Sequence, residues 1–356
     1  MSKSIKVTFI NEVFFSQHMV KNVIREYKDQ KPYQIAPAPD VEHLPKVKGH
    51  DFEKDFHLDT FLQSYATTGF QATHLARATE IVQEMRREHA TIFLGYTSNI
   101  VSSGLRDIIT FLVRNKHVHV LVTTAGGIEE DIIKCLKPFA IGIFNVSGRS
   151  MFEKGINRTG NIFIPNDRYL YFEKFINPFL DRLYNEQKEK GIVHTSTEII
   201  HELGKEMEKE KNCEESILYW AYKNNIPVFC PALMDGSFGD LVYFMKQRHS
   251  DFKIEMTGDS KSIIDLALNA DKAGAIILGA GIAKHFILNA NIFREGLDYA
   301  VFVNTAEEFD GSDSGALGEE AITWGKIKTT ATQVKVHADA TIVFPLLVAG
   351  TFAKKD

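Results

Sequence analysis

The stretch 307–326 combines residue types that can do chemistry. It reads EEFDGSDSGALGEEAITWGK and follows the apolar run 299–303. Its acceptors for a cationic ligand are Asp310, Asp313, Glu319 and Glu320, and its glycines at positions 311, 315 and 318 allow tight backbone turns. Because open α/β folds bind ligands beyond the carboxyl ends of parallel strands, this loop is where we first expect a binding site.

Lys326 is the residue of this stretch best suited to covalent chemistry. It follows a glycine and lies two positions after Trp324. A large aromatic ring beside a lysine can exclude water and so favour the neutral amine, which is the nucleophile in imine formation. The alternative interpretation is a solvated acidic loop that carries a surface lysine.

The elements that must position this loop follow a repeated order of apolar run, small polar cluster and helix. The apolar runs are 90–94, 118–122, 227–230, 275–278 and 301–303, with a further run at 341–344 after the group 337–340. Continuous apolar runs alternating with helices predict an α/β fold with a Rossmann-like, mostly parallel sheet and helices on both faces.

The small polar clusters predict a nucleotide site along one edge of that sheet. Glycines, threonines and helix amino termini at the strand ends would together bind an anion such as the pyrophosphate of a dinucleotide. The cluster 279–281 reads GAG and is not a full GxGxxG motif. The alternative is that small residues only allow helices to pack close to strands.

Composition limits the classes of protein. With 44% hydrophobic and 24% charged residues in 356, the chain is typical of a soluble globular protein. We expect an amino-terminal arm at 1–45, which is rich in proline, and a single domain at 46–356. A net charge of −5 without a basic stripe argues against general nucleic-acid binding.

Cellular context is constrained in the same way. The longest apolar runs are too short to span a bilayer, and no signal peptide is evident, so we expect a cytoplasmic protein with no membrane partner. The three cysteines form no CxxC pair, and no cluster has metal-ligand spacing, so neither a disulfide framework nor a metal is predicted.

Two details concern the middle of the chain. An aromatic stripe at 172–183 has helical spacing and is expected in the core or at a subunit interface, although Pro178 should kink or interrupt the helix. Thr195 and Glu198 fit a capping box that begins the next helix.

Five long segments resemble deoxyhypusine synthase. They are 67–75 (TTGFQATHL), 121–136, 309–316 (FDGSDSGA), 319–327 (EEAITWGKI) and 334–353. The resemblance implies a cytoplasmic homotetramer with active sites at dimer interfaces and NAD as a transient redox cofactor. It also implies transfer of the 4-aminobutyl group of spermidine to one lysine of the precursor of translation initiation factor 5A.

Site residues follow from the resemblance position by position. It implies that Lys326 forms the imine and that His285 accepts a proton. The residues implied for the polyamine are Glu129, Glu130, Asp240, His285, Gly311, Ser312, Asp313, Glu320 and Trp324. Those implied for NAD are Ser98, Asn99, Ile100, Val101, Ser102, Thr124, Ala125, Gly126, Glu130, Asp235, Ala280, Thr305, Ala306, Asp339 and Ala340.

Two positions depart from the family pattern. Ala280 replaces a glycine that is common there, so its methyl group is expected to affect the NAD contact, and Phe286 stands where a second histidine is common. Other functions remain open at this point. They are a homospermidine synthase that uses putrescine as acceptor, a non-catalytic NAD-binding regulatory paralogue, and a generic NAD-dependent dehydrogenase.

Overall fold

The computed structural model describes residues 42–353. The arm predicted for residues 1–45 therefore lies almost entirely outside the described residues. The chain divides into two units, Met1–Lys46 and Val47–Asp356. The architecture below is that of the second unit.

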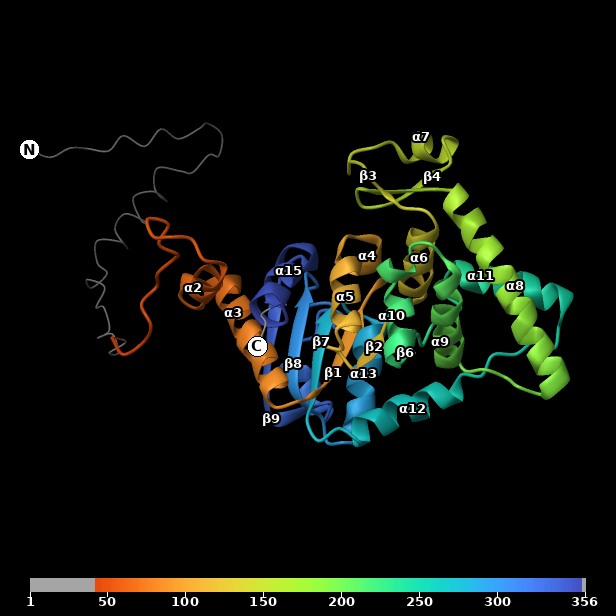
Figure 1. The fold of residues 1–356 in the computed structure, drawn as a ribbon. Coiled ribbons are helices and arrows are strands. Elements are labelled where there is room, and N and C mark those ends of the chain that lie inside the picture. The colour runs from red at the N-terminus through yellow and green to blue at the C-terminus, as the bar shows by residue number, and fades with distance from the viewer. Residues whose placement is uncertain (1–41, 354–356) are drawn as a thin grey trace, which may run out of the picture. The chain divides into compact units, whose positions relative to one another are not determined.

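A six-stranded sheet forms the centre of this unit, with the strand order β6-β2-β1-β7-β8-β9 (Figure 1). All five pairings within it are parallel, which confirms the predicted sheet type. The strands are β1 (Thr91–Tyr96), β2 (Val120–Val122), β6 (Val228–Phe229), β7 (Ala273–Leu278), β8 (Leu297–Asn304) and β9 (Ile327–His337).

The central strands are apolar along their whole length because both of their faces are covered. In β7, Ile276 and Leu278 belong to one core cluster, while Ala275 and Ile277 belong to another. Successive side chains of a strand point to opposite faces of the sheet. The two clusters are therefore the two cores, one on each face.

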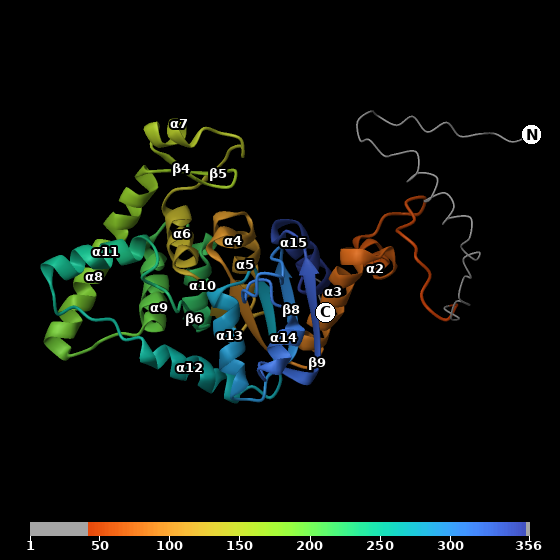
Figure 2. The same ribbon diagram turned by 180° about the vertical axis from the view of Figure 1, so that it is seen from behind.

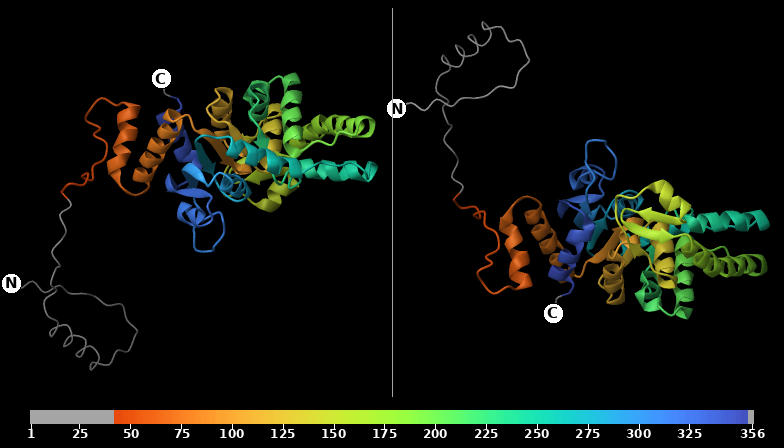
Figure 3. Two further views of the ribbon diagram at one scale, coloured as in Figure 1. Left: turned by 90° about the horizontal axis from the view of Figure 1, so that it is seen from below. Right: turned by 90° about the horizontal axis from the view of Figure 1, so that it is seen from above.

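Helices cover both faces, as predicted. One core includes residues of α3 (Phe70–Arg87), α5 (Leu105–Arg114) and α15 (Ala340–Thr351). The other includes residues of α12 (Thr257–Leu268), α13 (Ile282–Ile292) and α14 (Gly318–Thr323). Figure 2 shows α13 and α14 in front of the sheet, and Figure 3 shows the layers edge-on.

The other described helices surround this centre. They are α2 (Leu58–Thr68), α4 (Ser98–Ser102), α6 (Ala125–Leu136), α7 (Gly148–Glu153), α8 (Asp167–Lys190), α9 (Ser196–Glu206), α10 (Ile217–Asn224) and α11 (Ser237–Arg248), with short 3₁₀ turns at Met207–Lys209 and Cys213–Glu215. Within residues 42–353, no helix is both long and apolar enough to cross a bilayer.

The middle of the chain confirms two predictions and bears on a third. The aromatic stripe of α8 is buried through Phe172, Ile176 and Phe179, and Thr195 and Glu198 form the expected capping box. However, α8 runs without interruption through Pro178. Burial of the stripe on both sides of Pro178 offsets the one backbone hydrogen bond that the proline removes.

Two further features differ from the sequence prediction. The run 341–344 is the first part of helix α15, which Asp339 caps, and the preceding strand is β9. A small antiparallel sheet of β3 (Ala140–Ile141), β4 (Ile156–Thr159) and β5 (Ile162–Pro165), in the order β3-β5-β4, was not predicted. Such short strands give too little periodicity to be recognised from sequence.

Candidate active site

The stretch 307–326 crosses the sheet from one end to the other. It leaves the carboxyl end of β8 after Asn304 and finishes at Lys326, immediately before the amino end of β9. Because β8 and β9 are parallel, the connection between them must traverse the sheet. The expectation that the whole stretch lies at the carboxyl ends of the strands is therefore wrong for its last residues, Lys326 included.

A pocket of about 340 Å³ lies against α13 and α14 and contains six of the predicted site residues. These six are His285, Gly311, Asp313, Glu320, Trp324 and Lys326, and the remaining lining residues are Lys284, Leu288, Asn289, Ile292, Ala316, Leu317 and Ala321. Residues far apart in sequence thus meet around the amine of Lys326. We refer to this hollow as the Lys326 pocket.

Local structure explains how these side chains meet. His285, Leu288 and Ile292 recur at helical spacing, so one face of α13 forms a wall of the pocket. After α14, Gly325 has a left-handed φ of 69°, which turns the chain back toward β9. This turn buries Lys326, whose exposed fraction is 8%, and the Lys326 Nζ lies 5.7 Å from the centre of the Trp324 ring.

The two oxygens of the Asp313 carboxylate lie in different environments. Nδ1 of His285 lies 3.2 Å from Oδ1 of Asp313. Oδ2 of Asp313 is buried and has no hydrogen-bond partner among the described residues. A buried carboxylate oxygen without a partner is costly, so it would gain from an ammonium group placed beside it.

Two carboxylates predicted alongside Asp313 are not in this pocket. Asp310 accepts a hydrogen bond from the backbone N–H of Ser312 at 2.8 Å, and both residues are exposed. Glu319 accepts one from Gln333 at 3.0 Å, in a separate hollow beside β9. Of the four acceptors, only Asp313 and Glu320 therefore line the Lys326 pocket.

Two lysines that were not predicted hold the loop before α14. Lys284 donates to the carbonyls of Asp313 and Ala316, and Lys335 donates to those of Ala306 and Gly315. Burial lowers the pKa of Lys284, which is 2% exposed. Lys284 lies on the inward face of α13 together with Ile287 and Leu288, and a lysine at such a position is the signal that could have revealed it.

A second group of predicted residues lies at the carboxyl ends of the strands, along what we call the rim. Helices α4 and α6 begin there, and Oγ of Ser98 lies 2.6 Å from Oγ1 of Thr124. A Cβ at Gly126 would approach Oγ of Ser98 to 2.6 Å, so glycine is required for this packing. The side chains of Ile100 and Val101 are buried in the core, which leaves their backbones for any contact with a cofactor.

Of the acidic residues predicted at the rim, Glu129 and Glu130 lie on α6, Asp240 lies on α11, and Asp235 lies just before α11. Burial, with Glu129 nearby, raises the pKa of Glu130 to about 7, and Ser102 donates a hydrogen bond to Glu130. Glu129 accepts the backbone N–H of Phe238 at 3.2 Å in the first turn of α11, and burial raises its pKa. Asp240 lies on that same first turn.

The remaining rim residues follow β7, β8 and β9. Gly279 and Gly281 have left-handed φ values of 83° and 67°, and Ala280 lies between them. The chain therefore keeps glycine at both left-handed positions, and the backbone accepts alanine at 280. Asn304 fixes the next segment by donating to the Gly279 carbonyl at 3.3 Å and accepting the Ala306 N–H at 3.1 Å.

The end of the rim completes this arrangement. Thr305, which is exposed, follows β8, and Asp339 accepts the Thr341 N–H at 2.8 Å, which caps α15 directly after β9. Several helix amino termini and glycine turns therefore lie along the rim, and this chemistry fits the pyrophosphate and ribose groups of a dinucleotide. Within the described part of the chain, no group of three or more His, Cys, Asp or Glu is placed to hold a metal ion.

The predicted residues thus form two groups in one chain. Of the described residues that line the Lys326 pocket, none belongs to the set predicted for NAD, and neither Glu130 nor Asp240 is among them. The rim lies at the carboxyl ends of the strands, whereas Lys326 precedes the amino end of β9.

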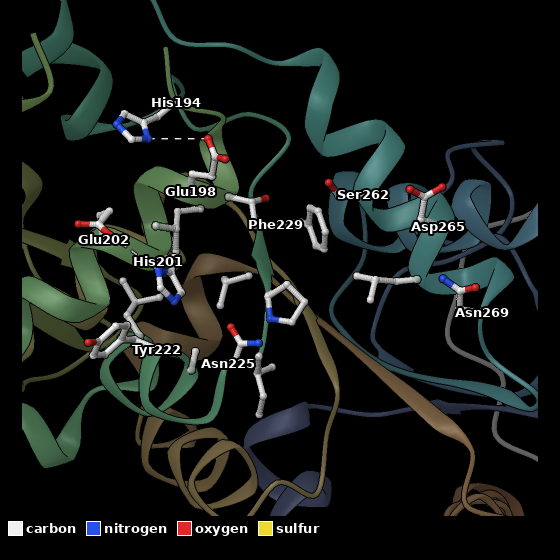
Figure 4. Close-up of a pocket in the computed structure, with 18 residues that line it drawn as sticks. His194, Glu198, His201, Glu202, Tyr222, Asn225, Phe229, Ser262, Asp265 and Asn269 are labelled. Carbon is white, nitrogen blue, oxygen red and sulfur yellow. Dashed lines mark ion pairs between the residues drawn. The ribbon is translucent and has the colours of Figure 1, made fainter. Parts of the chain in front are cut away.

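A wider cavity elsewhere contains none of these residues. It measures about 760 Å³ and lies between α9, α10, β6 and α12 (Figure 4). At its edge, Nε2 of His194 is within hydrogen-bond distance, 2.9 Å, of Oε2 of Glu186. None of the described residues that line this cavity was predicted to bind substrate or cofactor, so volume alone does not locate the site.

Comparison with known proteins identifies the family. The family model described as deoxyhypusine synthase matches residues 60–351. The chain belongs to the deoxyhypusine synthase family. The deoxyhypusine synthase of Musa acuminata is 49% identical over 340 residues, which cover 88% of this chain and 89% of that protein.

A second relative and a crystal structure are also similar to this chain. The protein named "Probable deoxyhypusine synthase" in Methanocaldococcus jannaschii is 49% identical over 322 residues, which cover 87% of this chain and 97% of that protein. A crystal structure assigned to the same family, from Entamoeba histolytica, aligns with a TM-score of 0.64 at 31% identity. It covers 86% of this chain and 97% of that one, and so confirms the fold.

Proposed function

We propose that this chain transfers the 4-aminobutyl group of spermidine to a lysine of the translation initiation factor 5A precursor, in the cytoplasm and with NAD as cofactor. The observation that most supports this proposal is the Lys326 pocket, where a buried amine lies beside an aromatic ring, a His285–Asp313 pair and a carboxylate oxygen without a partner. A nucleophilic amine in a site that attracts cations suits imine chemistry on a polyamine.

In this reaction Asp313 and Glu320 hold the ammonium groups of spermidine, and Trp324 covers them with its ring face. His285 takes a proton from the secondary amine as the neighbouring carbon is oxidised. NAD, when bound, accepts a hydride from that carbon and later returns it. Rim residues such as Ser98, together with the helix amino termini of α4 and α6, would hold it.

Lys326 then attacks the oxidised carbon, forms a C–N bond and releases 1,3-diaminopropane. The acceptor lysine displaces Lys326 from the resulting imine, which leaves Lys326 free again. The hydride that NAD would supply would reduce the new imine to a secondary amine. The two redox steps cancel, so the reaction consumes one spermidine and one acceptor lysine with no net oxidation.

We further propose that two copies of the chain form each complete site within a homotetramer. In one chain, none of the described residues predicted for NAD lines the Lys326 pocket, which supports an arrangement in which the rim of one copy faces the Lys326 pocket of another. Trp324, 66% exposed in the isolated chain, would then be covered.

A transfer assay tests the function. The protein is incubated with NAD, spermidine and the precursor, and intact-mass spectrometry follows the precursor. We expect one aminobutyl addition that requires both NAD and spermidine, with release of 1,3-diaminopropane. Parallel reactions replace the precursor with putrescine. Transfer to putrescine alone would support a homospermidine synthase, and NADH accumulation without an acceptor would support a simple dehydrogenase.

A further inference from the structure

Residues 305–317 connect β8 to α14, and we call them the active-site loop. Lys335 joins two parts of this loop that lie nine residues apart. Its Nζ donates to the carbonyl of Ala306 at 2.7 Å and to the carbonyl of Gly315 at 2.9 Å. The first carbonyl belongs to the segment assigned above to NAD. The second lies two residues after Asp313, which is assigned above to spermidine.

The loop is closed tightly at the point where Lys335 holds it. A Cβ at Gly315 would lie 1.5 Å from the carbonyl oxygen of Glu307. The backbone at Gly315 therefore packs directly against the backbone at Glu307. Lys284 holds the far side through the carbonyls of Asp313 and Ala316. All the acceptors of these two ammonium groups are backbone carbonyls, so the lysines fix the path of the loop.

Lys335 is itself fixed from the other side of β9. Nδ1 of His74 lies 3.0 Å from the Lys335 carbonyl, and Oε1 of Gln71 accepts the His337 N–H at 2.6 Å. Both residues belong to the TTGFQATHL segment, which the site described above leaves without a role. This segment therefore anchors the strand from which Lys335 reaches the loop.

We propose that Lys335 is a positioning residue that ties the segment Thr305–Ala306 to the segment carrying Asp313, so that the cofactor and spermidine subsites depend on one ammonium group. This inference rests on the proposed function for the identity of the two ligands. The Lys335 ammonium donates hydrogen bonds to the Ala306 and Gly315 carbonyls at the same time. An apolar side chain of the same length would donate to neither.

The test compares Lys335→Met with the unmodified protein by calorimetry, titrating NAD and spermidine separately. We expect both dissociation constants to rise roughly tenfold or more, the size expected for lost charge-assisted hydrogen bonds. Hydrogen exchange measured by mass spectrometry should become faster in the peptide covering 305–317. Lys335→Arg should recover most of the affinity for both ligands, because it also donates to carbonyls.

Lys246→Met is the matched control. Lys246 also donates to two backbone carbonyls, those of Ser250 and Phe252, at the far end of α11. It should lower thermal stability about as much as Lys335→Met while leaving both affinities unchanged. If Lys335→Met fails to fold, Lys335→Gln, which keeps one short donor group, serves in its place.

The outcomes separate this inference from the proposed function. Lower thermal stability of Lys335→Met with both affinities unchanged would overturn the positioning role. Loss of affinity for only one ligand would overturn the coupling of the two subsites. Failure of the unmodified protein to bind spermidine or NAD would instead contradict the proposed function. The titrations of the unmodified protein reveal such a failure before any variant is compared.

Discussion

The carboxylate of Asp313 faces His285 with one oxygen, and its other oxygen is buried. Oδ1 lies 3.2 Å from Nδ1 of His285, and Oδ2 is buried without a hydrogen-bond partner among the described residues. One oxygen therefore orients the imidazole, and the other would gain from an ammonium group that reaches it. This division of roles defines how the Lys326 pocket would hold spermidine beside the proton acceptor.

Asp313→Ala should weaken spermidine binding by about 2 kcal/mol, because a hydrogen bond to a charged group is lost in a buried place. Affinity for NAD should change much less, and calorimetry with each ligand measures both. The matched control is Asp310→Ala, which removes an exposed carboxylate from the same loop. Equal losses for the two ligands in Asp313→Ala would argue against its assignment to the polyamine.

Gly315→Ala should disrupt the active-site loop, because its Cβ would lie 1.5 Å from the Glu307 carbonyl oxygen. We expect a loss of about 1–3 kcal/mol in the free energy of unfolding, together with weaker binding of spermidine. Urea unfolding and calorimetry measure the two effects. Gly104→Ala is the control, since nothing lies within 4 Å of a Cβ there.

Glu130 should make stability depend on pH. Burial raises its pKa from 4.5 to about 7, so between these values the folded chain holds a proton that the unfolded chain has lost. This carboxyl group therefore lowers stability progressively as pH rises from about 4.5 to 7, and fully above 7. Glu130→Gln should be more stable than the unmodified protein by about 1–3 kcal/mol at pH 8, with the difference gone near pH 4.5.

The same titration should appear in ligand binding. If Glu130 contacts a spermidine ammonium, affinity should rise as pH increases through about 7, because the carboxylate attracts the cation and the neutral acid does not. Glu130→Gln should remove that part of the pH dependence. A profile identical in the two proteins would exclude Glu130 from the polyamine site.

Mixing two inactive variants tests whether two copies form each site. Lys326→Arg removes the nucleophile, and Gly126→Ala crowds the rim against Ser98. If rim and pocket come from different copies, co-expression at equal amounts should restore about a quarter of the sites. Each variant expressed alone is the control. No recovery in mixed assemblies that mass spectrometry has verified would indicate that a single chain supplies both groups.

Sequence patterns were sufficient for the sheet type, and they singled out several residues that the structure brings into one pocket. Apolar runs such as 275–278 predicted a buried parallel strand because both of its faces are covered. Lys326 and Trp324 were singled out by type and spacing, and the structure places both in one pocket with Asp313. These features depend on local sequence, which is why they could be read directly.

Other features depend on contacts between distant segments. Glu319 and Glu320 are adjacent in sequence but line different hollows, because neighbouring residues on a helix point in different directions. Lys335 reaches carbonyls 20 and 29 residues earlier in the chain, which no local pattern reveals. Pro178 was expected to kink or interrupt α8, but the helix continues through it because burial of the flanking stripe outweighs the local preference of the proline.

Covalent trapping on Lys326 tests the central claim most directly. The protein is incubated with NAD and labelled spermidine, reduced with borohydride, digested and analysed by mass spectrometry. We expect label on the peptide that contains Lys326, and its passage to the precursor protein when the precursor is added before reduction. In Lys326→Arg the label should be absent and transfer should fall at least about 10³-fold. Unlabelled Lys326 in a protein that binds NAD and transfers the aminobutyl group, or normal transfer by Lys326→Arg, would contradict the covalent role of this lysine.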